Sequence, residues 1–274
     1  MSASVGTALV TGASTGIGAT YADRLARRGY NLILVARDQA RLEALAEKLQ
    51  AETGVKVQTL RADLTNKADL SFVETRLASD PSITLLINNA GAAASGAFTG
   101  QDPDNHQALI DLNITALTRL TAAAAPGFVA RGKGAIINLS SVLALVSEFG
   151  MPVYNATKAY VLLLTRALQT ELGPKGVYLQ AVLPAATRTE IWERGGADIN
   201  ALPEGSVMDV DTLVDAAFVG FDRRELITIP TLKDEGQWEA FDAARLAMLP
   251  NFRSDTPAER YREPVDVWPP AVFA

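Results

Sequence analysis

The stretch Thr7-Ala-Leu-Val10 runs straight into Thr11-Gly-Ala-Ser-Thr-Gly-Ile-Gly18 in a chain of 274 residues. We expect the first four residues to form an apolar strand, and a helical stretch follows the last glycine. A glycine-rich turn in this setting is typical of dinucleotide binding, because glycine lets backbone N–H groups approach a pyrophosphate at the positive end of the helix. The spacing Gly-x-x-x-Gly-x-Gly differs from the common Gly-x-Gly-x-x-Gly, so an ordinary turn is the alternative. We favour phosphate binding at this turn.

Short apolar strands alternate with longer helices through most of the chain, which predicts an α/β fold with a doubly wound parallel sheet and helices on both faces. The expected strands are 7–10, 31–36, 56–60, 83–87, 135–139, 177–183 and 226–229. The expected helices are 19–28, 38–52, 67–77, 103–130 and a helix that carries Tyr154 and ends at Leu172. No internal repeat or linker is visible, so we expect one domain over residues 1–274.

Composition excludes several classes of protein. The formal net charge of −6 argues against a nucleic-acid surface. The absence of cysteine excludes disulfides, thiolate metal sites and cysteine nucleophiles, and we expect no metal site. The chain begins without a secretory signal pattern and has no apolar run of the ~20 residues that a membrane span needs. We therefore expect a soluble, cytoplasmic protein without a membrane partner.

Tyr154-Asn-Ala-Thr-Lys158 places a phenol and an amine four residues apart on one face of a helix. An ammonium ~4 Å away, at an effective dielectric of ~20, would favour the phenolate by ~4 kcal/mol, or about three pKa units. The phenol would then suit general acid–base catalysis near neutral pH. Tyr-x-x-x-Lys also occurs by chance in amphipathic helices, so the pattern gains its meaning from the rest of the chain.

The motifs taken together resemble the short-chain dehydrogenase/reductase family. These are the glycine-rich turn, Asn88-Asn-Ala-Gly91, Ser141 and Tyr154-x-x-x-Lys158, in the family's order and spacing. The resemblance covers roughly residues 5 to 190 and is strongest to NADP-dependent ketone and ketoacyl reductases of bacteria. It implies a Rossmann-type sheet of seven strands, a small carbonyl or alcohol substrate, and a homodimer or homotetramer formed through the two long helices.

The same resemblance implies a catalytic set. Ser141, thirteen residues before Tyr154, would donate a hydrogen bond to the substrate carbonyl oxygen, and the interval selects it over Ser140. Tyr154 would protonate that oxygen, while Lys158 would lower the pKa of the phenol and hold the nicotinamide ribose. Asn113 would help to hold a water on the proton path; a kink partner in its helix is the alternative.

Arg37 points to the phosphorylated cofactor. An acidic residue at the end of the second strand normally holds a ribose 2′-hydroxyl, whereas arginine accommodates a 2′-phosphate. In the family's register the acidic position falls on Ala36, and Arg37 follows it. We therefore expect NADP(H) rather than NAD(H), although Thr15 stands where some NADP-dependent relatives have a second base. The alternative is that Arg37 starts a solvated helix face and Asp38 caps that helix.

Further cofactor contacts are implied after other strands. Asp63 and Leu64 would border the adenine, although Asp63 alone could equally be a helix cap. The family's Pro-Gly-x-Val/Ile-x-Thr reads Pro184-Ala-Ala-Thr-Arg-Thr189 here, with Ala185 in place of glycine. The full expected cofactor set is Gly12, Ser14, Thr15, Gly16, Ile17, Gly18, Arg37, Asp63, Leu64, Asn88, Ala90, Gly91, Tyr154, Lys158, Pro184, Thr187 and Thr189.

The sequence predicts the chemistry better than the substrate. A lid is expected at about 188–210, where Trp192 could line a pocket, and a C-terminal extension at about 231–274, with residues 263–274 extended or disordered. We expect an NADPH-dependent reductase of a ketone, aldehyde or 3-oxoacyl carbonyl, or the reverse reaction. The alternatives are a non-catalytic NADP(H)-binding sensor or scaffold and, less favoured, a lyase or epimerase that uses the same tyrosine and lysine.

Overall fold

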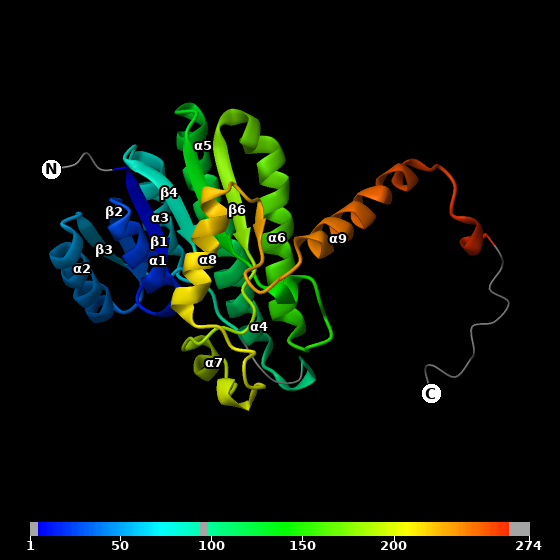
Figure 1. The fold of residues 1–274 in the computed structure, drawn as a ribbon, viewed down its shortest axis with the longest axis horizontal. Coiled ribbons are helices and arrows are strands. Elements are labelled where there is room, and N and C mark those ends of the chain that lie inside the picture. The colour runs from blue at the N-terminus through cyan, green and yellow to red at the C-terminus, as the bar shows by residue number, and fades with distance from the viewer. Residues whose placement is uncertain (1–4, 94–97, 263–274) are drawn as a thin grey trace. The chain divides into compact units, whose positions relative to one another are not determined.

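A parallel sheet of seven strands in the order β3-β2-β1-β4-β5-β6-β7 forms the centre of the computed structural model, which describes residues 5–93 and 98–262 (Figure 1). The strands are β1 (Thr7–Thr11), β2 (Asn31–Ala36), β3 (Val57–Arg61), β4 (Ile83–Asn88), β5 (Gly134–Leu139), β6 (Val177–Val182) and β7 (Ile227–Thr228). Every pairing is parallel, with β1 lying between β2 and β4. The strand order reverses direction beside β1, and such switch points are where open α/β sheets bind ligands. The predicted Rossmann-type fold is confirmed.

Helices cover both faces of this sheet. The main ones are α1 (Gly16–Arg27), α2 (Gln39–Thr53), α3 (Lys67–Ser79), α5 (Leu117–Ala130), α6 (Pro152–Leu172) and α8 (Val210–Asp222). Buried residues of α1, α2 and α8 pack together on one face, and those of α3, α5 and the end of α6 pack on the other. Among residues 5–93 and 98–262, no helix combines the length and the apolar character needed to cross a bilayer.

Two helix starts follow the sequence rules for capping. The Asp38 side chain accepts a hydrogen bond from the Arg41 N–H at the start of α2, and the Asn66 side chain accepts from the N–H groups of Ala68 and Asp69 at the start of α3. The alternative for Asp38, that it caps its helix, is therefore confirmed. Asp63 is not the cap of α3: its carboxylate accepts instead from the backbone and hydroxyl of Thr65.

The long helical region that we expected over 103–130 is divided. It consists of α4 (Pro103–Ile110), a π-helical turn (Asp111–Ala116) and α5. A π-turn inserts an extra residue into the helical repeat and is frequent at functional sites. It contains Asn113, so the local irregularity coincides with a predicted site residue.

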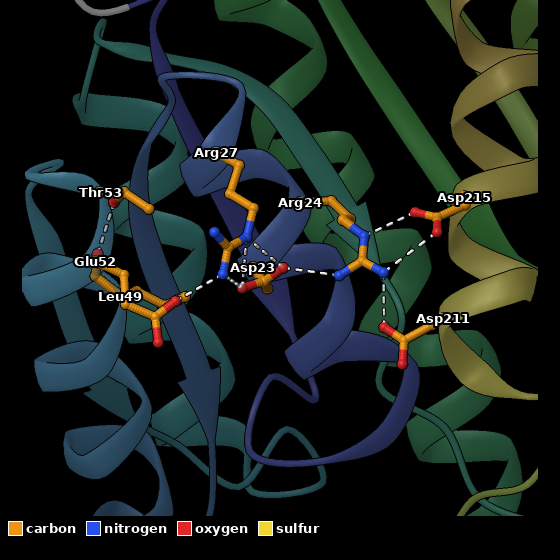
Figure 2. A network of polar contacts seen from close by, with 8 residues as sticks. All are labelled: Asp23, Arg24, Arg27, Leu49, Glu52, Thr53, Asp211 and Asp215. Atoms are coloured by element: carbon orange, nitrogen blue, oxygen red, sulfur yellow. Dashed lines mark hydrogen bonds and ion pairs between the residues drawn. The ribbon is translucent and has the colours of Figure 1, made fainter.

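Charged side chains join α1 to its neighbours on the outer surface (Figure 2). Arg24 bonds to Asp211 and Asp215 of α8, both at 2.7 Å, and to Asp23 at 2.8 Å. Arg27 extends the network to Glu52 of α2 at 2.6 Å. Exposed ion pairs contribute little singly, but a connected set fixes the helices on this face relative to one another.

The described chain divides into two compact units, one ending at Thr231 and one starting at Leu232. The second unit contains α9 (Glu235–Ala247) and two short 3₁₀ turns, Leu249–Arg253 and Glu259–Tyr261. None of the residues of α9 is buried, and Phe241 and Leu246 are among its exposed apolar side chains. The expectation for residues 263–274 lies outside the described residues.

Candidate active site

Several segments that the sequence singled out follow strands whose carboxyl ends lie along one edge of the sheet. The glycine-rich turn follows β1, Asn89 follows β4, Ser141 follows β5 and Pro184 follows β6. Because β1, β4, β5 and β6 are consecutive in the sheet, these segments are neighbours in space. Ligands of open α/β sheets bind outside this edge.

In the glycine-rich turn, backbone atoms lie closer to their neighbours than a side chain would allow. Gly12 has a φ of 65°, and a Cβ on Gly18 would lie 2.3 Å from the Gly12 carbonyl oxygen and 2.5 Å from Asn89 Nδ2. A side chain at either position would force the turn apart. Thr15, the N-cap of α1, makes no capping bond with its side chain, and the first turn of α1 contains no acid. The positive end of α1 is therefore left for an external anion such as a pyrophosphate.

Hydrogen bonds of Thr11 and Asn89 join the glycine-rich turn to the end of β4. The Thr11 hydroxyl donates to the Ile87 carbonyl and accepts from the backbone N–H groups of Asn89 and Ala90. The Asn89 side chain donates to the carbonyls of Thr11 and Gly12. We did not predict these roles from the sequence, since Asn-Gly-type clusters are also plain turn chemistry.

Tyr154 and Lys158 lie on α6 with the amine beside the aromatic ring. Lys158 Nζ is 5.6 Å from the centroid of the Tyr154 ring and donates to the Leu139 carbonyl at 2.8 Å. The lysine side chain is buried, with a relative exposure of 6%. Gly91 leaves room at this point: a Cβ there would lie 3.5 Å from Lys158 Nζ and 3.2 Å from Asn113 Oδ1.

The pKa values of this pair differ from our expectation. Loss of solvent raises the pKa of the Tyr154 phenol to about 12, although a hydrogen bond with Ser141 acts in the opposite direction. Burial lowers the pKa of the Lys158 amine to about 8. The expectation of a phenol made acidic by its lysine is wrong for the free protein, because desolvation raises the pKa of the phenol and only the hydrogen bond with Ser141 opposes it. At neutral pH the phenol is thus a protonated donor.

The two adjacent serines have different surroundings. The Ser140 hydroxyl donates to the Lys158 carbonyl at 2.8 Å and so joins β5 to α6. Ser141 Oγ accepts from the Leu143 N–H at 3.1 Å, has only a long 3.4 Å contact to the Pro184 carbonyl, and bonds with Tyr154. Its place beside the phenol gives a structural reason for the choice of Ser141.

Asn113 holds two segments of the site together. Its carboxamide accepts from the Ala92 N–H at 2.9 Å and donates to the Ala92 carbonyl at 3.0 Å. It also donates to Thr157 Oγ1 at 3.1 Å, next to Lys158. Both amide hydrogens are used in these bonds, so the side chain positions the loop after β4 against α6. Its part in a proton path stays a prediction.

The Asn88 side chain is buried and forms its hydrogen bonds within the core. Its amide donates to Thr121 Oγ1 and to Asn138 Oδ1, and Asn138 donates in turn to Thr165. All four residues are buried. A cofactor contact from Asn88 would therefore come from its backbone.

The expected adenosine contacts lie around the ends of β2 and β3. Arg37 is exposed and directly follows β2. Burial acts to raise the pKa of the Asp63 carboxyl, but the hydrogen bonds from Thr65 and the charge of Arg37 lower it overall. Leu64 is buried in one core cluster, and Ala90 is partly buried against that cluster. Ile17 is partly buried against the other cluster. No hydrogen bond of the Ser14 side chain was found among the described residues.

The loop after β6 closes over the glycine-rich turn. A Cβ on Gly16 would lie 3.3 Å from the Thr189 methyl group. Thr187 is buried and pairs with Met208, so residues near both ends of the expected lid are joined. Trp192, on the short helix α7 (Ile191–Arg194), donates its indole N–H to the Thr187 carbonyl at 2.8 Å. Trp192 is thus tied to this loop.

A cluster of charges around Glu190 was not predicted. Its carboxylate accepts hydrogen bonds from Thr15, Arg41 and Arg194. The only hint in the sequence is the pair Arg37 and Arg41, four residues apart, because Glu190 lies far from both in the chain. Among the described residues, no group of three or more His, Asp or Glu side chains is arranged to hold a metal ion.

Comparison with known proteins agrees with this site. The family model described as short chain dehydrogenase matches residues 6–200. The chain belongs to the short-chain dehydrogenase family. This family consists of oxidoreductases, and the resemblance that we inferred from the motifs is confirmed.

Solved structures of this family include similar proteins over nearly the whole chain. A short-chain dehydrogenase from Sphingobium yanoikuyae in complex with NADPH is 58% identical, with a TM-score of 0.92 over 94% of this chain and 100% of that one. A bulky-bulky ketone specific alcohol dehydrogenase from Comamonas testosteroni is 52% identical, with a TM-score of 0.88 over 95% of this chain and 100% of that one. A very-long-chain 3-oxoacyl-CoA reductase of Danio rerio is 36% identical over 188 residues, which are 67% of this chain and 59% of the relative. The match thus spans about three fifths of that curated relative.

Proposed function

We propose that this short-chain dehydrogenase is an NADPH-dependent reductase that converts the carbonyl of a ketone, aldehyde or 3-oxoacyl compound into an alcohol, or carries out the reverse. The observation that carries the proposal is the grouping of Ser141, Tyr154 and Lys158 beside an uncapped helix start at one edge of the sheet. The NADPH complex of the similar Sphingobium protein supports the choice of cofactor.

The residues present fit a nicotinamide dinucleotide. The first turn of α1 offers free N–H groups to the pyrophosphate, and the bare backbones of Gly12 and Gly91 leave space where a Cβ would meet neighbouring atoms. Arg37 offers a guanidinium for a 2′-phosphate, and Lys158 a buried amine for the nicotinamide ribose. When bound, NADPH supplies the hydride that reaches the carbonyl carbon.

The chain's own residues would handle the charge and the proton. The Ser141 hydroxyl would donate a hydrogen bond to the carbonyl oxygen, on which negative charge grows. The Tyr154 phenol would give its proton to that oxygen and recover one from solvent. A phenol whose pKa lies near 12 is protonated at neutral pH, so it has a proton to donate. Lys158, when charged, would stabilise the phenolate that remains.

Turnover distinguishes this function from a sensor or scaffold. NADPH oxidation would be followed over ketones with small and with bulky groups on both sides of the carbonyl, and over 3-oxoacyl thioesters. The proposal predicts oxidation with at least one class, and its loss in Tyr154→Phe while NADPH still binds. Binding of NADPH without turnover on any substrate would favour the non-catalytic alternative. The bulky-ketone specificity of the similar Comamonas enzyme makes that class the first to test.

We also propose that the chain associates with copies of itself through α5 and α6. A groove of about 390 Å³ runs between these helices, with Ala122 and Leu168 among its lining residues. Leu163 on α6 is 67% exposed. Light scattering should show a dimer or tetramer that Leu168→Glu weakens, whereas a monomeric wild type would contradict the proposal.

A further inference from the structure

Glu190 joins three segments that are distant in the sequence. Its Oε1 accepts from the Thr15 hydroxyl at 3.1 Å and from Arg41 Nη1 at 2.9 Å, and Arg41 also reaches Oε2 at 3.0 Å. Arg194 of α7 bonds to the same carboxylate. Because one oxygen accepts from both partners, the Arg41 guanidinium lies beside the hydroxyl of the glycine-rich turn.

This position is where the adenosine ribose of a dinucleotide would lie. The ribose binds between the turn after the first strand and the end of the second strand. Thr15 belongs to the first of these segments, and Arg41 to the first turn of α2, which follows β2. Arg37 stands on the other side of the Asp38 cap, four residues earlier. Two guanidinium groups therefore stand near one predicted phosphate position.

We propose that Arg41 is a second contact for the 2′-phosphate of NADP(H), and that Glu190 is the carboxylate that occupies it until the phosphate arrives. The inference rests on the cofactor of the proposed function. Arg41 would thus be a specificity-determining residue, and Glu190 an internal competitor that occupies the guanidinium in the free protein.

The exchange of carboxylate for phosphate is physically reasonable. Both side chains of the pair are accessible, Arg41 at 47% and Glu190 at 38%, and exposed ion pairs are weak. A phosphate brings up to two charges and three acceptor oxygens, which suit a guanidinium better than a single carboxylate. The hydrogen bond from Arg41 also lowers the pKa of Glu190, so the competitor is ionised at neutral pH.

The ion pairs of Arg41 with Asp38 and of Glu190 with Arg194 need not break when phosphate replaces the Glu190 carboxylate at Arg41. Asp38 Oδ2 lies 3.3 Å from Arg41 Nε, and Nη1 is the atom that bonds to Glu190. Arg194 keeps Glu190 as its own partner on α7. Glu190 therefore retains a cation when it releases Arg41.

Calorimetry with adenosine fragments tests the inference without turnover. The probes are 2′,5′-ADP and 5′-AMP, which differ only in the 2′-phosphate. We expect Arg41→Gln to raise the Kd for 2′,5′-ADP about tenfold and to change the Kd for 5′-AMP less than about twofold. Glu190→Gln should lower the Kd for 2′,5′-ADP about threefold, and should have no effect when Arg41 is already glutamine.

Two further variants make the outcome specific. Lys48→Gln removes a positive charge from the same helix about two turns further on, and should leave both constants within about twofold. Arg37→Gln tests the cofactor assignment on its own. If Arg37→Gln weakens 2′,5′-ADP but Arg41→Gln does not, or if Lys48→Gln acts as strongly as Arg41→Gln, the inference is overturned and the proposed function stands. If the wild type does not prefer 2′,5′-ADP to 5′-AMP, the NADP(H) assignment and the inference both fail.

Discussion

The proposed catalytic residues and the proposed phosphate-binding residues lie along the same sheet edge but in opposite environments. Ser141 and Lys158 are both only 6% exposed, whereas Arg41 is 47% and Glu190 38% exposed. Burial raises the pKa of Tyr154 to about 12 and lowers that of Lys158 to about 8, while Arg41 forms accessible ion pairs with Asp38 and Glu190. In the proposed function, the chemistry therefore depends on desolvated groups and the choice of cofactor on accessible surface charges. Each prediction below tests one side of this comparison.

The largest effect should come from the proton donor. Tyr154→Phe removes the phenolic proton and leaves the ring, so we expect turnover to fall about 1,000-fold or more, within the range of general acid catalysis. The Kd for NADPH should change less than about twofold. NADPH oxidation and calorimetry measure the two quantities, and a variant that keeps a tenth of wild-type turnover would contradict the role of Tyr154.

The adjacent serines provide a matched pair. Ser141→Ala should lower kcat about 100-fold, since removal of one donor to a developing oxyanion has effects of that order. Ser140→Ala removes only the bond to the Lys158 carbonyl, and should lower the free energy of unfolding by about 1 kcal/mol while kcat falls less than tenfold. The reverse order of kcat effects would show that Ser140 is the substrate donor.

Lys158→Met should separate activity from stability. We expect turnover to fall by about 50-fold. Its burial lowers the pKa from 10.5 to about 8, which corresponds to an unfavourable term of about 3 kcal/mol for the charged form. Loss of the bond to the Leu139 carbonyl offsets part of the gain, so we expect the free energy of unfolding at pH 7 to rise by about 1–2 kcal/mol.

The sign of this effect depends on pH. Between pH 8 and about 10.4 the unfolded chain binds more protons at Lys158 than the folded protein, so wild-type stability rises with pH in this window. The burial penalty is fully present below pH 8 and absent above about 10.4. Urea unfolding should therefore show an advantage of Lys158→Met that shrinks across this range. An advantage that is constant with pH would contradict burial of the charged amine.

The smallest effect should be on the exposed side. Arg37→Asp should raise the KM for NADPH at least tenfold, because a carboxylate would repel the 2′-phosphate. The kcat should change little, and the KM for NADH should not rise. An unchanged KM for NADPH would remove Arg37 from the phosphate site.

The features that the sequence predicted well are local. The seven strands and the glycine-rich turn are set by residues close together in the chain, and periodicity and turn chemistry report them directly. The choice of Ser141 by its interval to Tyr154 depended instead on the family resemblance. The helix expected over 38–52 was also located within one residue at each end, since α2 spans Gln39–Thr53.

The features that the sequence did not predict depend on distant partners. The sequence did not show that the Asn88 amide donates to Thr121 and Asn138 in the core, and its contact with the cofactor stays a prediction for the backbone. The π-turn around Asn113 arises in a stretch of ordinary helical composition. Glu190 bonds to Thr15 and Arg41 because the loop after β6 folds over the glycine-rich turn. The pKa of Tyr154 moves opposite to our expectation because pair spacing carries no information about burial.

The pH dependence of kcat/KM for NADPH, at saturating ketone, tests the central claim most directly, since this ratio reports the pKa values of the free enzyme. With a Lys158 pKa of about 8 and a Tyr154 pKa of about 12, the ratio should fall about twofold between pH 7 and 8 and about 50-fold between pH 8 and 10. Lys158→Met should lack this step. A wild-type ratio that stays level to pH 10, or an identical step in Lys158→Met, would contradict the assignment of proton transfer to a buried tyrosine–lysine pair.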